Sequence, residues 1–376
     1  MDFALTDDQT MIRDAAESFL GDVSDSAAVR RAMDSENGFD REVWQRIGSE
    51  LGWCGVAIAE AHGGLGLGPV ELALIQEQAG RRLLCSPFFA TVCAAATVIA
   101  EIGSEPACAQ WLPRIAAGEI AMGMPLYGDV GDWATHAQAI QARADGDRWR
   151  LDGVAARVAD GATADVLLVF AETDSGLGLF AVERAATGVE LNPLPTWDRT
   201  RRFAAVRFAA AGAQRLDSAA RIDDGLSRAA SLLRLYLAAE QLGCAQQCLD
   251  LTVDYTATRK QFGRVVGGFQ AVKHRCAQMM VKIEALRSAV YGAAACAAGR
   301  VETRQLAMEC IMARLLAVDA AFYCAQEAIQ LHGGVGFTWE YDPQLYFKRA
   351  QAAANWFGNA ERLRAELADA LLDDAA

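Results

Sequence analysis

The chain has 376 residues, of which just over half (53%) are apolar, and it carries a formal net charge of −13. A chain of this length is expected to divide into two or three domains, since a single core stops growing beyond about 250–300 residues. The acidic balance argues against nucleic acid and against an anionic membrane surface as partners, because both attract a positive field. An anionic ligand would therefore have to be bound by local arginines.

The N-terminal segment, the lengths of the apolar runs and the spacing of the cysteines bear on the cellular compartment of the protein. No apolar run approaches the ~18 residues of a membrane span, and the N-terminal segment MDFALTDDQT carries acid where a signal peptide carries base. We therefore expect a cytoplasmic protein without a membrane partner. The ten cysteines stand singly, with no C-x-x-C pair, which predicts buried free thiols and no metal site.

The spacing of apolar residues changes twice along the chain. Residues 1–118 follow the helical period and predict an N-terminal helical domain, with Asp7 as the N-cap of its first helix. Residues 119–221 contain short β-rich runs punctuated by D-G and S-G turn signals, which predicts a middle antiparallel β domain. Residues 222–376 return to the helical period in three long runs and a shorter final one, which predicts a C-terminal four-helix bundle. The expected fold class is α+β.

Two segments of the last domain carry residues suited to an anion, DYTATRKQFGRVVGGFQAVKH (254–274) and QLHGGVGFTWE (330–340). Arg259 supplies a planar fork of donors that matches phosphate oxygens, and Gly333 and Gly334 let a backbone approach a ligand closely. Three glutamines add neutral amide donors: Gln261, Gln270 and Gln330. The residues alone are equally consistent with a solvated helix end and a C-cap turn.

The pattern R-x-Q-F-G-x(6)-Q followed by Q-x-x-G-G-x-G-F resembles the C-terminal signature of the acyl-CoA dehydrogenase family of flavoproteins, and the likeness covers residues 1–370. The resemblance implies the acyl-CoA dehydrogenase fold, FAD as cofactor, an acyl-CoA substrate, and electron-transfer flavoprotein or a similar acceptor as partner. It also implies that this region reaches the adenosine diphosphate part of a neighbouring subunit's FAD. The residues it assigns to that role are Arg259, Gln261, Phe262, Gln270, Gln330, Gly333 and Gly334.

The family's catalytic base is missing from both of its known places. In the family, a carboxylate removes the α proton of the acyl-CoA while the β hydrogen leaves as hydride to the flavin. Alignment puts Phe357 in the usual place of the base and Leu233, seventeen residues before Asp250, in the second place. Glu240 is the nearby replacement candidate. It lies two helical turns, about 11 Å, beyond Leu233, which favours a structural helix acid in a polar seam or subunit contact.

The residues of this chain at the places that hold the flavin ring also differ from the family pattern. The segment GMPLYGDVGDW (123–133) keeps only Pro125 and Gly128 of the family's "T-E-P-x-A-G-S-D", and in GVAARVADG Arg157 takes the aromatic place and Ala159 the hydroxyl place. The resemblance thus implies that this chain has kept the residues that contact the FAD of a neighbouring subunit. It has lost the residues that would hold a flavin ring of its own.

Three hypotheses follow. The first is a non-catalytic subunit of a heteromeric α2β2 FAD-dependent acyl-CoA dehydrogenase, as in bacterial degradation of steroid side chains, that completes the FAD site of a base-bearing partner. The second is a self-sufficient homo-oligomeric dehydrogenase or flavin oxidase with a relocated base such as Glu240. The third is a flavin-free structural or ligand-binding relative.

Overall fold

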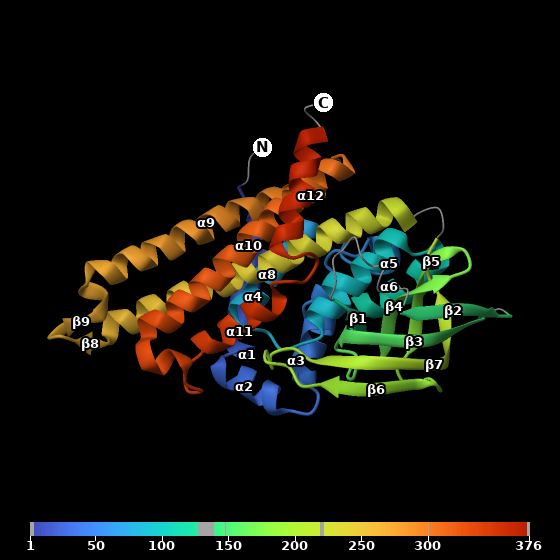
Figure 1. Cartoon of the computed structure of the whole chain (residues 1–376), viewed down its shortest axis with the longest axis horizontal. Coiled ribbons are helices and arrows are strands. Elements are labelled where there is room, and N and C mark those ends of the chain that lie inside the picture. The colour runs from blue at the N-terminus through green and yellow to red at the C-terminus, as the bar shows by residue number, and fades with distance from the viewer. Residues whose placement is uncertain (1–3, 127–138, 147, 219–221, 300, 374–376) are drawn as a thin grey trace.

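The computed structural model describes residues 4–126, 139–146, 148–218, 222–299 and 301–373. Figure 1 shows helices at both ends of the sequence packed together, with a β-sheet at one end of the long axis. The helical, β and helical order expected from the sequence is confirmed. The domain boundaries at 118 and 221 stay a prediction.

The N-terminal part is helical. Its elements are α1 (Asp7–Val23), α2 (Ser26–Asp34), α3 (Arg41–Gln45), η1 (Arg46–Glu50), η2 (Trp53–Gly55), η3 (Glu60–His62), α4 (Pro69–Arg81), η4 (Phe89–Ala96), α5 (Thr97–Ile102) and α6 (Glu105–Ala116). The predicted N-cap was wrong by one residue. Thr6 caps α1 through a capping box with Gln9, while Asp7 is the first helical residue, because the box satisfies two orphan backbone donors at once.

The middle part is a seven-stranded sheet in the order β1-β3-β2-β4-β5-β7-β6. Its strands are β1 (Met122–Pro125), β2 (Ile140–Asp145), β3 (Arg148–Ala159), β4 (Val166–Thr173), β5 (Gly176–Glu183), β6 (Val189–Leu194) and β7 (Phe203–Arg215). The pairings are antiparallel except where β4 meets β1 and β2. The sheet has a small core of its own, which includes Leu151, Val169 and Phe180.

The C-terminal part contains α8 (Ile222–Thr258), β8 (Lys260–Gln261), β9 (Arg264–Val265), η6 (Val266–Gly268), α9 (Gln270–Ala298), α10 (Thr303–His332), η7 (Gly333–Phe337), α11 (Pro343–Ala353) and α12 (Ala360–Asp373). The three long helices α8, α9 and α10 pack against one another along the long axis, and α12 crosses α10 (Figure 1). The small hairpin β8–β9 lies at the end farthest from the large sheet (Figure 1).

The N-terminal and C-terminal helices share one core, and α4 lies directly on the backbone of α8. A Cβ added to Gly80 would lie 2.0 Å from the carbonyl oxygen of Glu240, and one added to Gly243 would lie 1.8 Å from that of Glu77. Only glycine permits this approach, which brings the polar side chains of α4 beside those of α8.

All ten cysteines are free, and nine of them are buried while Cys276 is half-buried. Burial raises the pKa of the Cys54 and Cys85 thiols to about 12. The predicted free, buried thiols are confirmed. In the described parts of the chain no helix is both long and apolar enough to cross a membrane, and the cytoplasmic location stays a prediction.

Candidate functional site

A hairpin arm, residues 259–269, projects from the end of α8. Lys260 pairs with Val265 and Gln261 with Arg264. The turn between them uses left-handed backbone at Phe262 (φ 51°) and Gly263 (φ 77°), as a two-residue hairpin requires. Phe262 stands 89% exposed at the tip, so the arm presents an apolar ring that this chain does not cover.

Stacked aromatic rings join the base of the hairpin arm to the end of α10. The rings of Tyr255 and His332 stack with centroids 4.3 Å apart, and Tyr341 meets both edge-on at 6.0 Å. His332 is buried, its Nδ1 lies 2.7 Å from the carbonyl oxygen of Ala328, and burial lowers its pKa. Because Gly333 follows directly, the two segments that carry the family signature lie side by side.

The seven residues assigned to the cofactor from the sequence are all exposed, on the two segments that the stacked rings join: Arg259, Gln261, Phe262, Gln270, Gln330, Gly333 and Gly334. The Arg259 side chain forms no ion pair within the described residues. A Cβ at Gly333 or Gly334 would meet nothing within 4 Å. The chain therefore has an open surface here, with a guanidinium that is unpaired among the described residues and two bare backbone positions, and these donors suit phosphate oxygens.

Glu240 has no free oxygen. It is 2% exposed on the side of α8 that faces α4. Its Oε1 accepts a hydrogen bond from Arg349 Nη1 at 3.1 Å, and its Oε2 accepts one from Gln76 Nε2 at 2.7 Å and a very close one from Arg201. A general base needs a lone pair directed at the substrate. The geometry thus agrees with the structural interpretation of Glu240.

Glu240 belongs to a buried charge cluster of two arginines and two carboxylates. Arg349 also donates from Nε to Asp198 Oδ2 at 3.0 Å and contacts Thr200. Burial lowers the pKa of Arg201. Burial also acts to lower the pKa of Arg349, but the carboxylates of Asp198 and Glu240 outweigh it and raise that pKa. Since Asp198 and Arg201 come from the β6–β7 loop and Arg349 from α11, the cluster ties the sheet to the helices.

Phe357, to which the sequence alignment gives the usual place of the base, lies in a packed aromatic cluster. Phe357 is 1% exposed and Trp356 fully buried. Phe89 stacks on Phe357 at 6.4 Å, and Phe203 meets Trp356 edge-on at 5.6 Å. The guanidinium of Arg201 lies 4.6 Å from the ring centroid of Phe89 and 4.8 Å from that of Trp356, so rings and cation occupy the space together.

Two buried arginines fix the turn that carries Phe357. Arg314 donates to the carbonyl oxygens of Ala353 at 2.6 Å and Trp356 at 3.2 Å. Arg234 donates to the carbonyl oxygen of Phe357 at 3.1 Å and pairs with Glu366 at 2.7 Å. Burial lowers the pKa of both arginines. The turn is therefore rigid, although sequence reasoning assigned no role to either arginine.

Leu233, to which the sequence alignment gives the second place of the base, is wholly buried in α8. On the flavin-ring side, Ala159 is buried at the end of β3, while Arg157 is exposed. Pro125 ends β1, and Gly128 lies outside the described residues.

The half-buried Asp160 follows Ala159 with left-handed backbone (φ 54°). Burial raises the pKa of Asp160 to about 7, against the pull of Arg201, Arg349 and Arg202. Sequence reasoning gave this residue no role. Among the described residues no group of three His, Cys, Asp or Glu side chains suits a metal ion.

The order of helical, β and helical parts is that of a class of flavoprotein dehydrogenases, which confirms the fold predicted from the sequence. Two family models match it: Acyl-CoA dehydrogenase, N-terminal domain, over residues 6–119, and Acyl-CoA dehydrogenase, C-terminal domain, over residues 224–372. Acyl-CoA dehydrogenase IpdE2 of Mycolicibacterium smegmatis is 30% identical over 374 residues, covering 96% of this chain and 100% of the relative. The chain belongs to the acyl-CoA dehydrogenase family, whose members bind FAD.

Solved structures extend the comparison. The structure of a variant of the Tcur3481-Tcur3483 steroid ACAD superposes with a TM-score of 0.86 at 30% identity, covering 98% of each chain. The ChsE4-ChsE5 complex from Mycobacterium tuberculosis superposes with a TM-score of 0.87 at 28% identity, covering 99% of each chain. The predicted likeness to heteromeric steroid-pathway dehydrogenases is thereby confirmed.

Proposed function

We propose that this chain is the non-catalytic subunit of a heteromeric FAD-dependent acyl-CoA dehydrogenase and completes the FAD site of a base-bearing partner. The observation that carries the proposal is a contrast within one chain. Phe357 and Leu233 are buried where the family has its base, whereas the hairpin arm and its free Arg259 face outward.

The residues present fit only one half of FAD. The diphosphate would be bound by the fork of Arg259, with the backbone at Gly333 and Gly334 able to approach because no Cβ stands in the way. FAD, when bound, supplies the acceptor for the hydride that leaves the substrate. The ring half does not fit this chain, since Ala159 offers no hydroxyl and Arg201 with its aromatic neighbours fills the adjoining space.

The partner therefore has to supply the proton-accepting carboxylate. Glu240 already accepts from three donors, and no contact of the described residues favours its use as a relocated base. We take the substrate to be an acyl-CoA from bacterial steroid breakdown, because one similar structure is that of a steroid ACAD and another is a complex of two named chains. An electron-transfer flavoprotein is the proposed acceptor, by analogy with the family.

Flavin counting tests the proposal. The isolated chain should retain little FAD, and its complex with the partner should hold about one FAD per heterodimer, since only the partner has the ring-side contacts. The measurement is the absorbance of released flavin against protein concentration. In the complex, Arg259→Gln should lose FAD without changing the assembly. A full equivalent of FAD on the isolated chain would favour a self-sufficient enzyme instead.

A further inference from the structure

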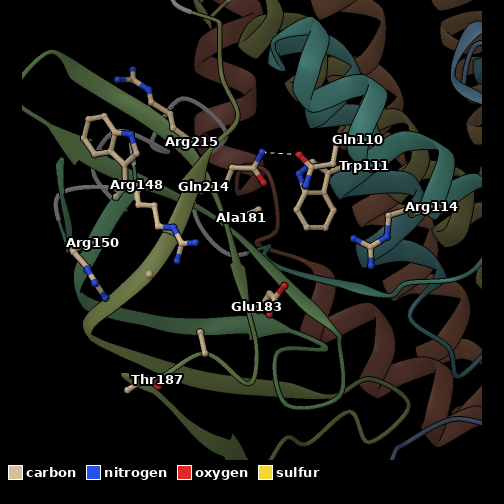
Figure 2. A pocket seen from close by; sticks show the side chains of 14 residues that line it. Gln110, Trp111, Arg114, Arg148, Arg150, Ala181, Glu183, Thr187, Gln214 and Arg215 are labelled. Carbon is tan, nitrogen blue, oxygen red and sulfur yellow. Dashed lines mark hydrogen bonds between the residues drawn. The ribbon is translucent and has the colours of Figure 1, made fainter. Parts of the chain in front are cut away.

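A concave site lies between α6 and the large sheet, at the end of the molecule opposite the hairpin arm. It is a groove of about 760 Å³. Figure 2 shows Trp111 and Arg114 of α6 on one side and Arg148 and Arg150 of β3 on the other, with Ala181 between them. Trp149 and Gly212 also line the groove. We call it the arginine groove, after Arg114, Arg148, Arg150 and Arg215.

The groove exists because β5 and β7 separate. They pair only at Phe180 with Arg215 and at Ala181 with Gln214. Beyond this point β7 pairs with β3 instead, for example Trp149 with Ala213. The space left beside Gly212 is bordered by α6, whose Gln110 accepts a hydrogen bond from Gln214 at 2.7 Å (Figure 2). The cavity is thus a product of the sheet topology rather than of one mobile side chain.

The arginines of the groove have donors to spare. Within the described residues, neither Arg114 nor Arg148 forms an ion pair. Arg150 uses Nε for Asp145 at 2.9 Å and Nη1 for the carbonyl oxygen of Ala210 at 3.2 Å, which leaves Nη2. Arg215 uses Nε and Nη2 for Asp217, which leaves Nη1. Glu183 is the sole carboxylate among the lining residues. Even with Asp145 and Asp217 counted, the four arginines outnumber these carboxylates, so the groove keeps a positive charge in a protein whose net charge is −13.

Tryptophan rings hold two of these guanidiniums in place. Arg114 lies 5.1 Å from the ring of Trp111, and Arg215 lies 5.3 Å from that of Trp149. Such contacts restrain a long side chain that would otherwise lose entropy on binding. Trp111 is 4% exposed, so its ring is a packed part of the groove wall.

We propose that the arginine groove binds a diphosphate group, either as free pyrophosphate or as part of a nucleoside diphosphate. Several guanidiniums on facing walls match adjacent phosphates, each of which accepts several hydrogen bonds at once. Pockets for small organic ligands have volumes of about 300–1,000 Å³, so the groove has room for a nucleoside as well. It is separate from the hairpin arm, which lies at the opposite end of the long axis (Figure 1).

Calorimetric titration of the full-length chain with pyrophosphate, ADP and adenosine tests this. Pyrophosphate and ADP should bind and adenosine should not. Tighter binding of ADP than of pyrophosphate assigns the groove to nucleotides, and equal binding assigns it to free diphosphate. Arg148→Gln should weaken binding at least about tenfold, since a hydrogen bond to a charged group contributes that much.

Two further variants make the result specific. Gly212→Val should block binding with all arginines intact, because its Cβ would meet only Arg150 Nη1, at 4.0 Å, and the branched side chain would enter the groove. Arg207→Gln, on an exposed arginine of β7 that pairs with Glu190 outside the groove, should leave binding unchanged. The proposal is overturned if neither anion binds, if adenosine binds as well as ADP, or if Arg148→Gln and Gly212→Val both bind as the wild type does.

Discussion

Replacing Glu240 by glutamine separates a structural acid from a catalytic one. The change removes the charge that faces Arg201 and Arg349 in a site where Glu240 is 2% exposed. Breaking a buried ion pair by removing one partner costs about 3–5 kcal/mol. We expect Glu240→Gln to lower the free energy of unfolding by about 3 kcal/mol. This is the low end of that range, because Arg349 keeps its ion pair with Asp198 and the amide oxygen still accepts one hydrogen bond.

The cost should be shared with Arg201, which a double-mutant cycle measures. Arg201→Met alone leaves Glu240 short of a cation, and adding Glu240→Gln to it should cost less than the same change in the wild type, by about 0.5–3 kcal/mol. Urea unfolding of the four proteins gives this coupling. Additive effects would show that the close Arg201–Glu240 pair contributes nothing.

The same variant should leave catalysis alone. The assay is enoyl-CoA formation with an artificial electron acceptor, for the complex of this chain with its partner. Per intact complex, Glu240→Gln should match the wild type. Loss of a general base costs on the order of 10²- to 10⁴-fold, and a loss of that size with flavin content and assembly intact would refute the reasoning and make this chain an enzyme in its own right.

Three other predictions address the arm, the turn and pH. Arg259→Lys should lower FAD retention in the complex and leave the fold intact, since two parallel donors become one; equal retention would mean that the arm is only a surface hairpin. Arg314→Met should lower the free energy of unfolding by about 1–3 kcal/mol, because buried carbonyl acceptors lose their donor; an unchanged urea midpoint would contradict this. Asp160 has a folded-state pKa of about 7, above its usual 3.8, so the folded state binds the extra proton and stability should fall as pH rises from 4 to 7. Asp160→Asn should reduce this dependence of stability on pH. If urea unfolding gives the same pH dependence for the variant and the wild type, the titration of Asp160 is not its cause.

Much of the fold follows from local patterns. The long helical runs after residue 222 correspond to α8, α9, α10 and α12, and the β-rich runs correspond to β4 and β5. Local periodicity did not separate α11, which is an 11-residue helix joined to α10 only through η7 and a short turn. Capping at Thr6 depended on Gln9 three residues on, and it was missed because an acid at Asp7 is an equally good local signal.

The charge cluster is beyond local patterns. Arg349 and Asp198 are separated by 151 residues in sequence, and Arg201 and Glu240 by 39. A pairing over such a distance depends on how the sheet packs on the helices, which no periodicity encodes. One signal was present all the same. Arg314 stands inside the apolar run CIMARLLAV, and a charged residue on a core-facing position usually has a buried partner.

The close backbone approach of α4 and α8 at Gly80 and Gly243 has a consequence for how this protein moves. At these two glycines the backbones of the helices are in direct contact, with no side chains between them. A shift of either helix along the other would therefore bring carbonyl oxygens into steric clash with the opposite backbone. α4 comes from the first third of the chain and α8 from its second half. The two should therefore move as one rigid piece, and a fragment cut between the sheet and α8 should not fold by itself, since α8 would leave half of its packing surface bare.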